Sequence, residues 1–136
     1  MQKRGDLLVW VILRISLGWI FLWAFFDKLF GLGFSTASDK SWIAGTSPTT
    51  GFLKFAAKGP FVSLFQGLAD NNLVDLLFML GLFCIGISLI LGILTKIAGY
   101  TGAIMMFLMW LALLLPQHNP ILDEHIIYLI ALLGLT

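Results

Sequence analysis

The chain has 136 residues, of which 60% are hydrophobic and 11% are charged, and its mean hydropathy is +1.00. A soluble domain is typically about 45–50% apolar with about a quarter of its residues charged, so this composition excludes a soluble globule and indicates an integral membrane protein. The net charge of +1 offers no basic surface for nucleic acid. The single cysteine, Cys84, excludes a disulfide framework and a thiolate metal cluster built by this chain alone.

Four apolar runs follow one another along the chain. A helix needs roughly 20 apolar residues to cross a bilayer, and Pro116 and Pro120 interrupt the sequence between the last two runs. We predict membrane helices over residues 7–28, 73–94, 97–115 and 121–136, of which the last is short. The expected fold is therefore all-α, a four-transmembrane-helix bundle in one domain over residues 1–136, with both termini on one side of the membrane.

The loop over residues 31–72, between the first two predicted helices, is long. Ser47 precedes a proline, which is typical of a helix N-cap, and Gly59 before Pro60 ends one segment and begins another. Both apolar segments are too short to span the membrane, so we expect them to lie in the interface or to cover the bundle as a cap. The predicted short helices are residues 48–58 and 60–69.

Two further patterns concern the helices themselves. Gly81, Cys84, Ser88 and Gly92 recur at spacings of three and four, which predicts a face that another helix can approach closely. Residues 95–96 form the expected tight link between the second and third membrane helices. Basic residues near the N-terminus and in that link favour a cytoplasmic location for both termini.

Ionisable side chains inside membrane helices cost several kcal/mol, so each is a candidate functional residue. The acids and bases in or beside the predicted spans are Arg14, Asp27, Lys28, Asp75, Asp123, Glu124 and His125. Glu124 and His125 lie four and three residues before Tyr128, so all three share a helix face.

Depth in the membrane allows two arrangements for Arg14. Glu124 lies about 18 Å of helix before Thr136, and Arg14 lies about 10 Å in from Leu7 on the same side. A long guanidinium side chain spans the remaining gap of about 8 Å, which would pair Arg14 with Glu124. Alternatively, Arg14 extends toward the lipid headgroups and the acids lie at the opposite interface.

Short motifs spread over almost the whole chain point to one group of membrane proteins. They are RISLG at 14–18, FLWA at 21–24, DKL at 27–29, SPTTGFL at 47–53 and LDEHIIY at 122–128. Together they resemble the DoxX-like family, and the loop motif resembles its DoxD branch, the larger subunit of thiosulfate:quinone oxidoreductase. The resemblance implies a subunit in the plasma membrane of a prokaryote that passes electrons from thiosulfate to quinone and gives tetrathionate, generally with a second protein subunit or as a homo-oligomer.

The residues can be assigned to roles within that implied activity. Acid–base capacity lies in Asp27, Asp75, Glu124 and His125; quinone contacts are expected from Arg14, Trp23, His125 and Tyr128; and a small oxyanion is expected at Lys28, Lys54 and Lys58. The sequence carries no haem, flavin, iron–sulfur or metal-binding motif. The alternative function is a non-enzymatic scaffold or chaperone for another membrane protein, which the small-residue faces serve equally well.

Overall fold

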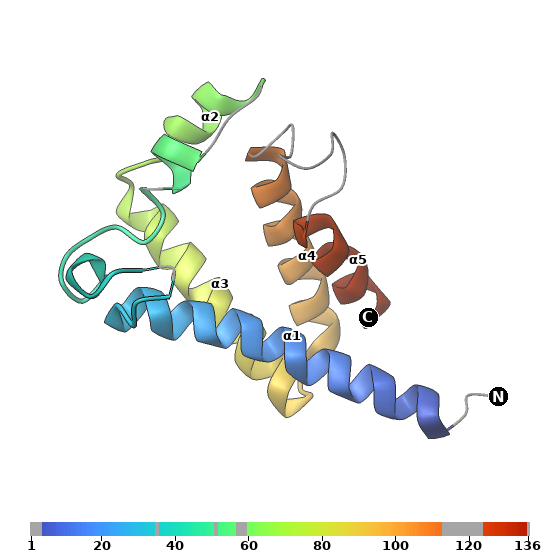
Figure 1. The fold of residues 1–136 in the computed structure, drawn as a ribbon. Coiled ribbons are helices and arrows are strands. Elements are labelled where there is room, and N and C mark those ends of the chain that lie inside the picture. Colours follow the sequence, from blue (N-terminus) through green and yellow to red (C-terminus); the bar gives the residue numbers. More distant parts are fainter. Residues whose placement is uncertain (1–3, 35, 51, 57–59, 113–123, 136) are drawn as a thin grey trace.

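The structure is a computed structural model that describes residues 4–34, 36–50, 52–56, 60–112 and 124–135. Every regular element in these ranges is helical (Figure 1). In chain order they are α1 (Arg4–Phe30), the 3-10 helix η1 (Ser38–Lys40), the π-helix η2 (Phe52–Ala56), α2 (Val62–Gln66), α3 (Asn72–Leu91), α4 (Thr95–Ala112) and α5 (Glu124–Gly134).

Three of these helices, α1, α3 and α4, are long and apolar enough to cross a membrane. The 20 residues of α3 measure about 30 Å, the thickness of the hydrocarbon core. The helix α5 is also apolar but has 11 residues in its described part. The all-helical membrane architecture expected from composition is therefore confirmed, with three candidate spans among the described residues.

The helices α1 and α3 cross at two glycines. An ideal Cβ placed on Gly86 would lie 2.8 Å from the backbone nitrogen of Leu22 and 3.0 Å from the carbonyl oxygen of Gly18. An ideal Cβ on Gly18 would lie 2.9 Å from the carbonyl oxygen of Gly86. The two backbones therefore touch, as small residues permit in membrane helices.

The predicted small-residue face of α3 is divided between two neighbours. Gly81 lies against the Cε atom of Met105 on α4, whereas Gly92 lies against Arg14 on α1. Cys84 is exposed. The close approach to α1 uses Gly86 instead, because Gly86 and Gly18 meet where the two helices cross.

The helix α5 packs onto α4 and reaches α1 at its C-terminal end. Leu132 is fully buried in the main core, where it lies against Gly102 of α4. Gly134 lies against the ring of Trp10. Figure 1 shows α1 steeply inclined to α4, with its N-terminal turns extending beyond the bundle, and residues 4–12 are all exposed.

The turn between α3 and α4 falls earlier than expected. Gly92 has a φ of +75°, caps α3 and donates its N–H to the carbonyl oxygen of Ser88, and Leu94 has a φ of +50°. The left-handed conformation at Gly92 ends the helix at Leu91, although Ile93 and Leu94 are as apolar as the helix itself. The link is therefore 92–94, and residues 95–96 begin α4.

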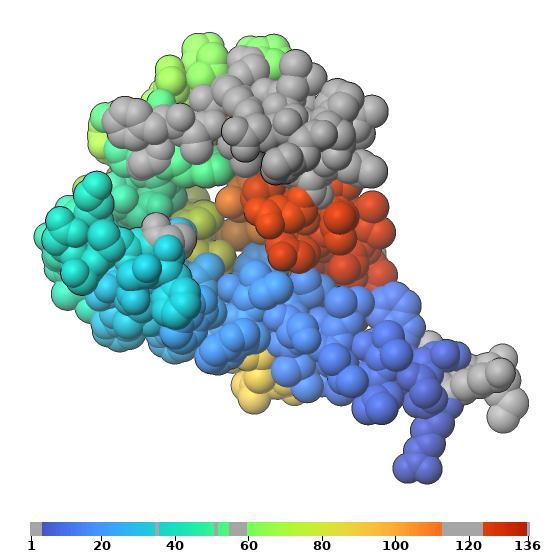
Figure 2. Space-filling model, in the orientation of Figure 1, coloured from blue at the N-terminus to red at the C-terminus, as the bar shows by residue number. Residues whose placement is uncertain are grey.

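The loop after α1 ends in short helices at the head of α3. The helices η2 and α2 lie within the segments expected to be helical, but they have five residues each. Leu53 and Phe65 are buried with Ala112 in a second apolar cluster, which ties the loop to the end of α4. Figure 2 shows the part of the loop that precedes residue 50 gathered at the C-terminal end of α1.

Candidate functional site

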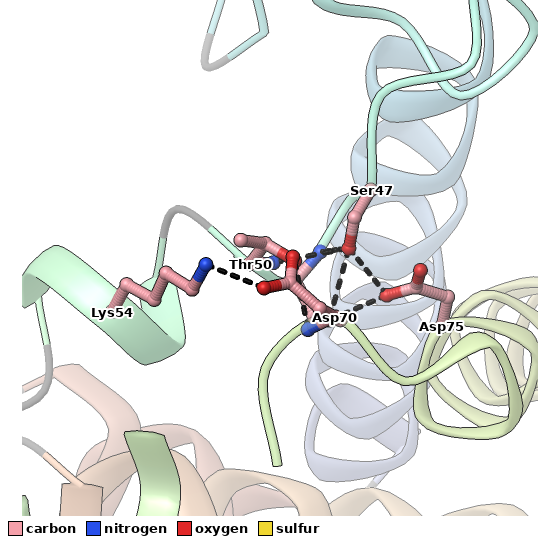
Figure 3. A network of polar contacts seen from close by, with 6 residues as sticks. Ser47, Thr50, Lys54, Asp70 and Asp75 are labelled. Atoms are coloured by element: carbon pink, nitrogen blue, oxygen red, sulfur yellow. Dashed lines mark hydrogen bonds and ion pairs between the residues drawn. The ribbon is translucent and has the colours of Figure 1, made fainter. Parts of the chain in front are cut away.

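Asp75, in the first turn of α3, is the centre of a buried polar network (Figure 3). Its side chain is 4% exposed. The hydroxyl of Ser47 donates a hydrogen bond of 2.7 Å to Oδ1 of Asp75, and the hydroxyl of Thr49 donates one of 2.5 Å to the same oxygen. Two hydroxyl donors on one oxygen suit an ionised carboxylate, because hydrogen bonds to a charged acceptor are the stronger kind.

The sequence around Ser47 explains how the loop presents these hydroxyls. Ser47 Oγ accepts from the backbone N–H groups of Thr49 and Thr50, at 3.4 and 3.2 Å. Pro48 fixes its own φ and donates no N–H, so it suits the first position of this turn. The serine hydroxyl therefore orders its own turn with its lone pairs and holds Asp75 with its proton.

A cavity of about 300 Å³ opens beside the carboxylate. It is lined by Trp42, Gly45, Ser47, Asp70, Asn72 and Asp75. Trp42 also donates its backbone N–H to the carbonyl oxygen of Lys28, at 2.8 Å, which joins the cavity wall to the end of α1. The volume is at the lower end of the range for small-molecule sites. Most of the lining residues are polar, and Trp42 is the aromatic residue among them.

Asp70 holds the outer edge of the site. Its carboxylate forms an ion pair with Lys54 and accepts a hydrogen bond of 3.2 Å from the hydroxyl of Thr50, which in turn accepts one from the backbone N–H of Asp70. Gln66 donates to the carbonyl oxygen of Lys54, at 3.1 Å. Asp70 has a φ of +60°, a conformation that aspartate tolerates better than most residues. These bonds fasten η2 to the chain that enters α3.

The same contacts lower the pKa of Asp70. The hydrogen bond from Lys54 is the main cause, and the positive charge of Lys54 and the hydroxyl of Thr50 lower the pKa further below its ordinary value of 3.8. A lowered pKa in the folded state contributes stability above the unfolded-state pKa, and this stability is lost as the pH falls through the folded-state pKa. Both side chains are exposed, so salt weakens the pair.

We therefore expect residues 52–70 to become more accessible to protease as the pH falls below the ordinary pKa of Asp70, and also at high salt. The Asp70→Asn variant should show the accessible loop already at neutral pH, with little further change on acidification. Limited proteolysis in detergent, at acidic and at neutral pH, with a protease that is active at both, measures this accessibility. Equal pH dependence of cleavage in Asp70→Asn and in the wild type would contradict the assignment.

Asp27 occupies a second buried position, at the end of α1. Its side chain is 1% exposed, and its Oδ1 accepts a hydrogen bond of 3.1 Å from the backbone N–H of Phe34. Gly31, with a φ of +68°, turns the chain so that this N–H faces the carboxylate. The neighbouring Lys28 is partly buried. Asp27 therefore anchors the turn after α1, while Asp75 lines the cavity.

Arg14 does not pair with Glu124. The guanidinium of Arg14 lies against Gly92, where an ideal Cβ would be 2.6 Å from Nη1, and Glu124 is exposed at the head of α5. The pairing required both residues at a similar depth in an upright bundle. In the structure α1 is inclined to α4 (Figure 1). The contact with Gly92 places Arg14 at the α3–α4 turn instead.

The other predicted quinone contacts are dispersed. Trp23 packs between Trp19 and Phe34, with ring centroids at 5.6 and 5.1 Å. His125 and Tyr128 are partly buried on α5, where Tyr128 packs against the main core. These residues are not among those that line the cavity beside Asp75.

The predicted oxyanion lysines that the structure describes, Lys28 and Lys54, have different surroundings. Lys54 is engaged by Asp70, and Lys28 lies next to Asp27 in α1. Lys58 lies outside the described residues, as do the ends of the third and fourth predicted spans at 113–115 and 121–123. Within the described part of the chain, no group of three or more His, Cys, Asp or Glu side chains is placed to hold a metal ion.

Of the predicted site residues, Asp75 is the one found in the cavity wall. The wall residues Trp42, Ser47 and Asp70 were not predicted as site residues. Thr49, the second hydroxyl donor to Asp75, was not predicted either. The SPTT motif was the available signal, since it places three hydroxyls in four residues. The motif predicts a helix start. In the structure Ser47 accepts hydrogen bonds from the backbone of its own turn and also donates one to Asp75.

Comparison with known protein families matches residues 9–114 to DoxX. The matched region includes most of α1, the loop that carries Ser47 and Thr49, the helices α3 and α4, and the residues that line the cavity beside Asp75. No curated protein and no solved structure matches the chain. The match covers most of the chain, and with three apolar spans it shows that the protein is an integral membrane protein of the DoxX family.

Proposed function

We propose that this protein is the membrane subunit of a quinone-dependent oxidoreductase that takes electrons from a small sulfur oxyanion. The observation that carries the proposal is the cavity beside Asp75, which places an aromatic ring and a buried carboxylate at the end of a membrane helix. A quinone headgroup needs a flat apolar wall and a group that exchanges protons with its oxygens. Trp42 supplies the wall and Asp75 the proton-exchanging group.

The proposed chemistry balances without a further reactant. Two thiosulfate ions each lose one electron as the S–S bond of tetrathionate forms, and the quinone takes up both electrons and two protons to become a quinol. Asp75 takes a proton from water and transfers it to a quinone oxygen, while Ser47 and Thr49 hold the carboxylate in place between transfers. The sulfur donor is inferred from the resemblance to the DoxD branch.

The oxyanion side of the proposal uses the charge of three lysines, Lys28, Lys54 and Lys58, which would attract the anion. One of them, Lys54, also forms an ion pair with Asp70. Glu124 and His125 keep the role of a second proton-exchanging group at the head of α5, and Tyr128 keeps the role of a quinone contact. A second protein subunit or a second copy of this chain would complete the oxyanion site.

The proposal includes the arrangement in the membrane. The helix α5 would be the fourth span, because Leu132 and Gly134 place it in the bundle beside α4 and α1. Its described part, Glu124–Gly134, measures about 16 Å. Four antiparallel spans put both termini on one side, and Arg4 and Lys96 on that side favour the cytoplasm of a prokaryotic cell.

Titration with a soluble quinone analogue in mild detergent tests the proposal, with quenching of the five tryptophans as the signal. We expect saturable quenching in the wild type by the reduced, quinol form of the analogue and about tenfold weaker quinol binding in Asp75→Asn, because the hydrogen bond that the quinol hydroxyl donates to a charged carboxylate is lost. Trp42→Phe should lose most of the saturable quenching. Asp39→Asn, which removes the same charge from an exposed loop position, is the matched control and should bind as the wild type does.

Two other outcomes have definite meanings. Saturable binding that is kept in Asp75→Asn but lost in His125→Ala would move the site to the head of α5. Non-saturable partitioning that is equal in the wild type and in both variants would remove the redox proposal.

The second candidate function is a scaffold or chaperone for another membrane protein, and one observation favours it. The N-terminal turns of α1 lie beyond the bundle (Figure 2). Large apolar side chains on these turns, such as Leu8 and Val9, are exposed. A partner helix could pack there. Loss of a co-purifying partner in Leu8→Asn but not in Leu77→Asn, an exposed position on α3, would support that function.

A further inference from the structure

Arg14 is a cation within a membrane helix that no described residue neutralises. Its Nε atom is buried and has no hydrogen-bond partner. An unpaired arginine in a membrane segment costs several kcal/mol, so such residues find a partner or mark a functional site. We therefore expect the partner of Arg14 to be a group other than the residues that the structure describes.

The contact with Gly92 gives the depth of the guanidinium. Gly92 caps α3, and an ideal Cβ on it would lie 2.6 Å from Nη1 and 3.0 Å from Cζ of Arg14. Because α3 measures about 30 Å, its two ends lie at the two boundaries of the hydrocarbon core. The guanidinium is therefore at the level of the lipid headgroups, although Arg14 belongs to the middle of the α1 sequence.

The surroundings of this position favour a negatively charged occupant. The helix α4 begins at Thr95 and has no acidic residue in its first turn, and Lys96 is exposed. Trp10, one turn before Arg14, and Tyr100, one turn after Lys96, are large aromatic residues that are partly exposed, as is typical of a membrane interface. The planar guanidinium of arginine can donate two parallel hydrogen bonds to two oxygens of one phosphate, so phosphate is a favoured ligand of arginine.

We propose that Arg14 binds the phosphate of an anionic lipid headgroup at the α3–α4 turn, with Lys96 contributing a second positive charge. A lipid is favoured over a free phosphate ion because the approach is apolar. Ile15, which follows Arg14 on α1, and Leu91 and Ile97, at the adjoining ends of α3 and α4, are all exposed, so the acyl chains of a lipid would contact them. This site is separate from the cavity beside Asp75 and does not depend on the proposed redox activity.

The experiment uses the whole chain in nanodiscs of phosphatidylcholine with and without a minority of phosphatidylglycerol. We expect phosphatidylglycerol to raise the melting temperature of the wild type, and native mass spectrometry to show retained phosphatidylglycerol. Arg14→Gln should retain about tenfold less, since charge-assisted hydrogen bonds are lost. Arg4→Gln, which removes the same charge at the exposed start of α1, is the matched control and should retain as much as the wild type.

Each remaining result decides the proposal. If Arg14→Gln does not fold, Lys96→Gln takes its place and should retain severalfold less phosphatidylglycerol than Arg4→Gln. Equal retention of phosphatidylglycerol in all variants, or equal retention of phosphatidylcholine and phosphatidylglycerol by the wild type, would overturn the proposal. Inorganic phosphate that raises the melting temperature in pure phosphatidylcholine by the same amount would overturn the lipid as the occupant.

Discussion

Gly86→Ala is expected to destabilise the protein by about 2 kcal/mol, although alanine is the better helix former. The new methyl group would lie 2.8 Å from the backbone nitrogen of Leu22 and 3.0 Å from the carbonyl oxygen of Gly18. Backbone atoms cannot move aside as the end of a flexible side chain can, so the two helices must separate along their contact. Gly86→Leu is expected to abolish folding, because no rotamer of leucine fits between touching backbones.

The matched control is Gly5→Ala in α1. An ideal Cβ on Gly5 has no atom within 4 Å, so this change should leave the stability unchanged or raise it by up to about 1 kcal/mol. Unfolding of the purified variants in mixed micelles, followed by tryptophan fluorescence, gives the free-energy difference. Equal stability of Gly86→Ala and Gly5→Ala would show that α1 and α3 do not touch at this crossing.

Asp75→Ala is expected to cost about 3 kcal/mol, because two charge-assisted hydrogen bonds are lost and two hydroxyls lose their acceptor. Ser47 and Thr49 are separated from Asp75 by 28 and 26 residues, so these bonds hold the loop against α3. Asp75→Asn keeps a side-chain oxygen that can accept both hydroxyls and should cost about 1 kcal/mol. The thermal unfolding midpoint and the protease sensitivity of the loop measure both effects.

A mutant cycle distinguishes the network from a general effect of removing a charge. Thr49→Val removes one of the two donors, so its cost should not add fully to that of Asp75→Ala. Asp39→Asn removes a carboxylate that lies in an exposed loop and should leave the midpoint unchanged. Full additivity of Thr49→Val and Asp75→Ala would show that the two side chains do not interact.

Helix positions in this protein follow mainly from local sequence. The predicted spans at 7–28 and 73–94 agree with α1 and α3 to within a few residues, because an apolar run of bilayer length is a property of consecutive residues. The end of α3 was misplaced by three residues, since Ile93 and Leu94 are apolar and hydropathy does not register the left-handed conformation at Gly92.

The candidate site was less accessible to prediction. Asp75 was identified because an acid in a membrane helix is conspicuous, but its partners are ordinary loop residues whose role depends on where the loop folds. The lysines were grouped by their charge and by their position on one side of the membrane. In the structure Lys54 is engaged by Asp70, an exposed acid that has no distinctive sequence context.

The position of Arg14 shows most clearly that contacts between distant residues could not be predicted from the sequence. Depth along an upright helix allowed it to reach Glu124, whereas the inclination of α1 brings it to Gly92. That inclination depends on the contact of Gly18 with Gly86, two glycines 68 residues apart that are individually unremarkable.

The sequence alone therefore determined the membrane class, the approximate spans and the family resemblance, because hydropathy and motifs are read from neighbouring residues. The tertiary structure alone decided which polar groups meet: Asp75 with Ser47 and Thr49, Lys54 with Asp70, and Arg14 with the end of α3. Contacts between distant residues depend on how the helices cross, and the crossing is set by the close packing of whole helix faces.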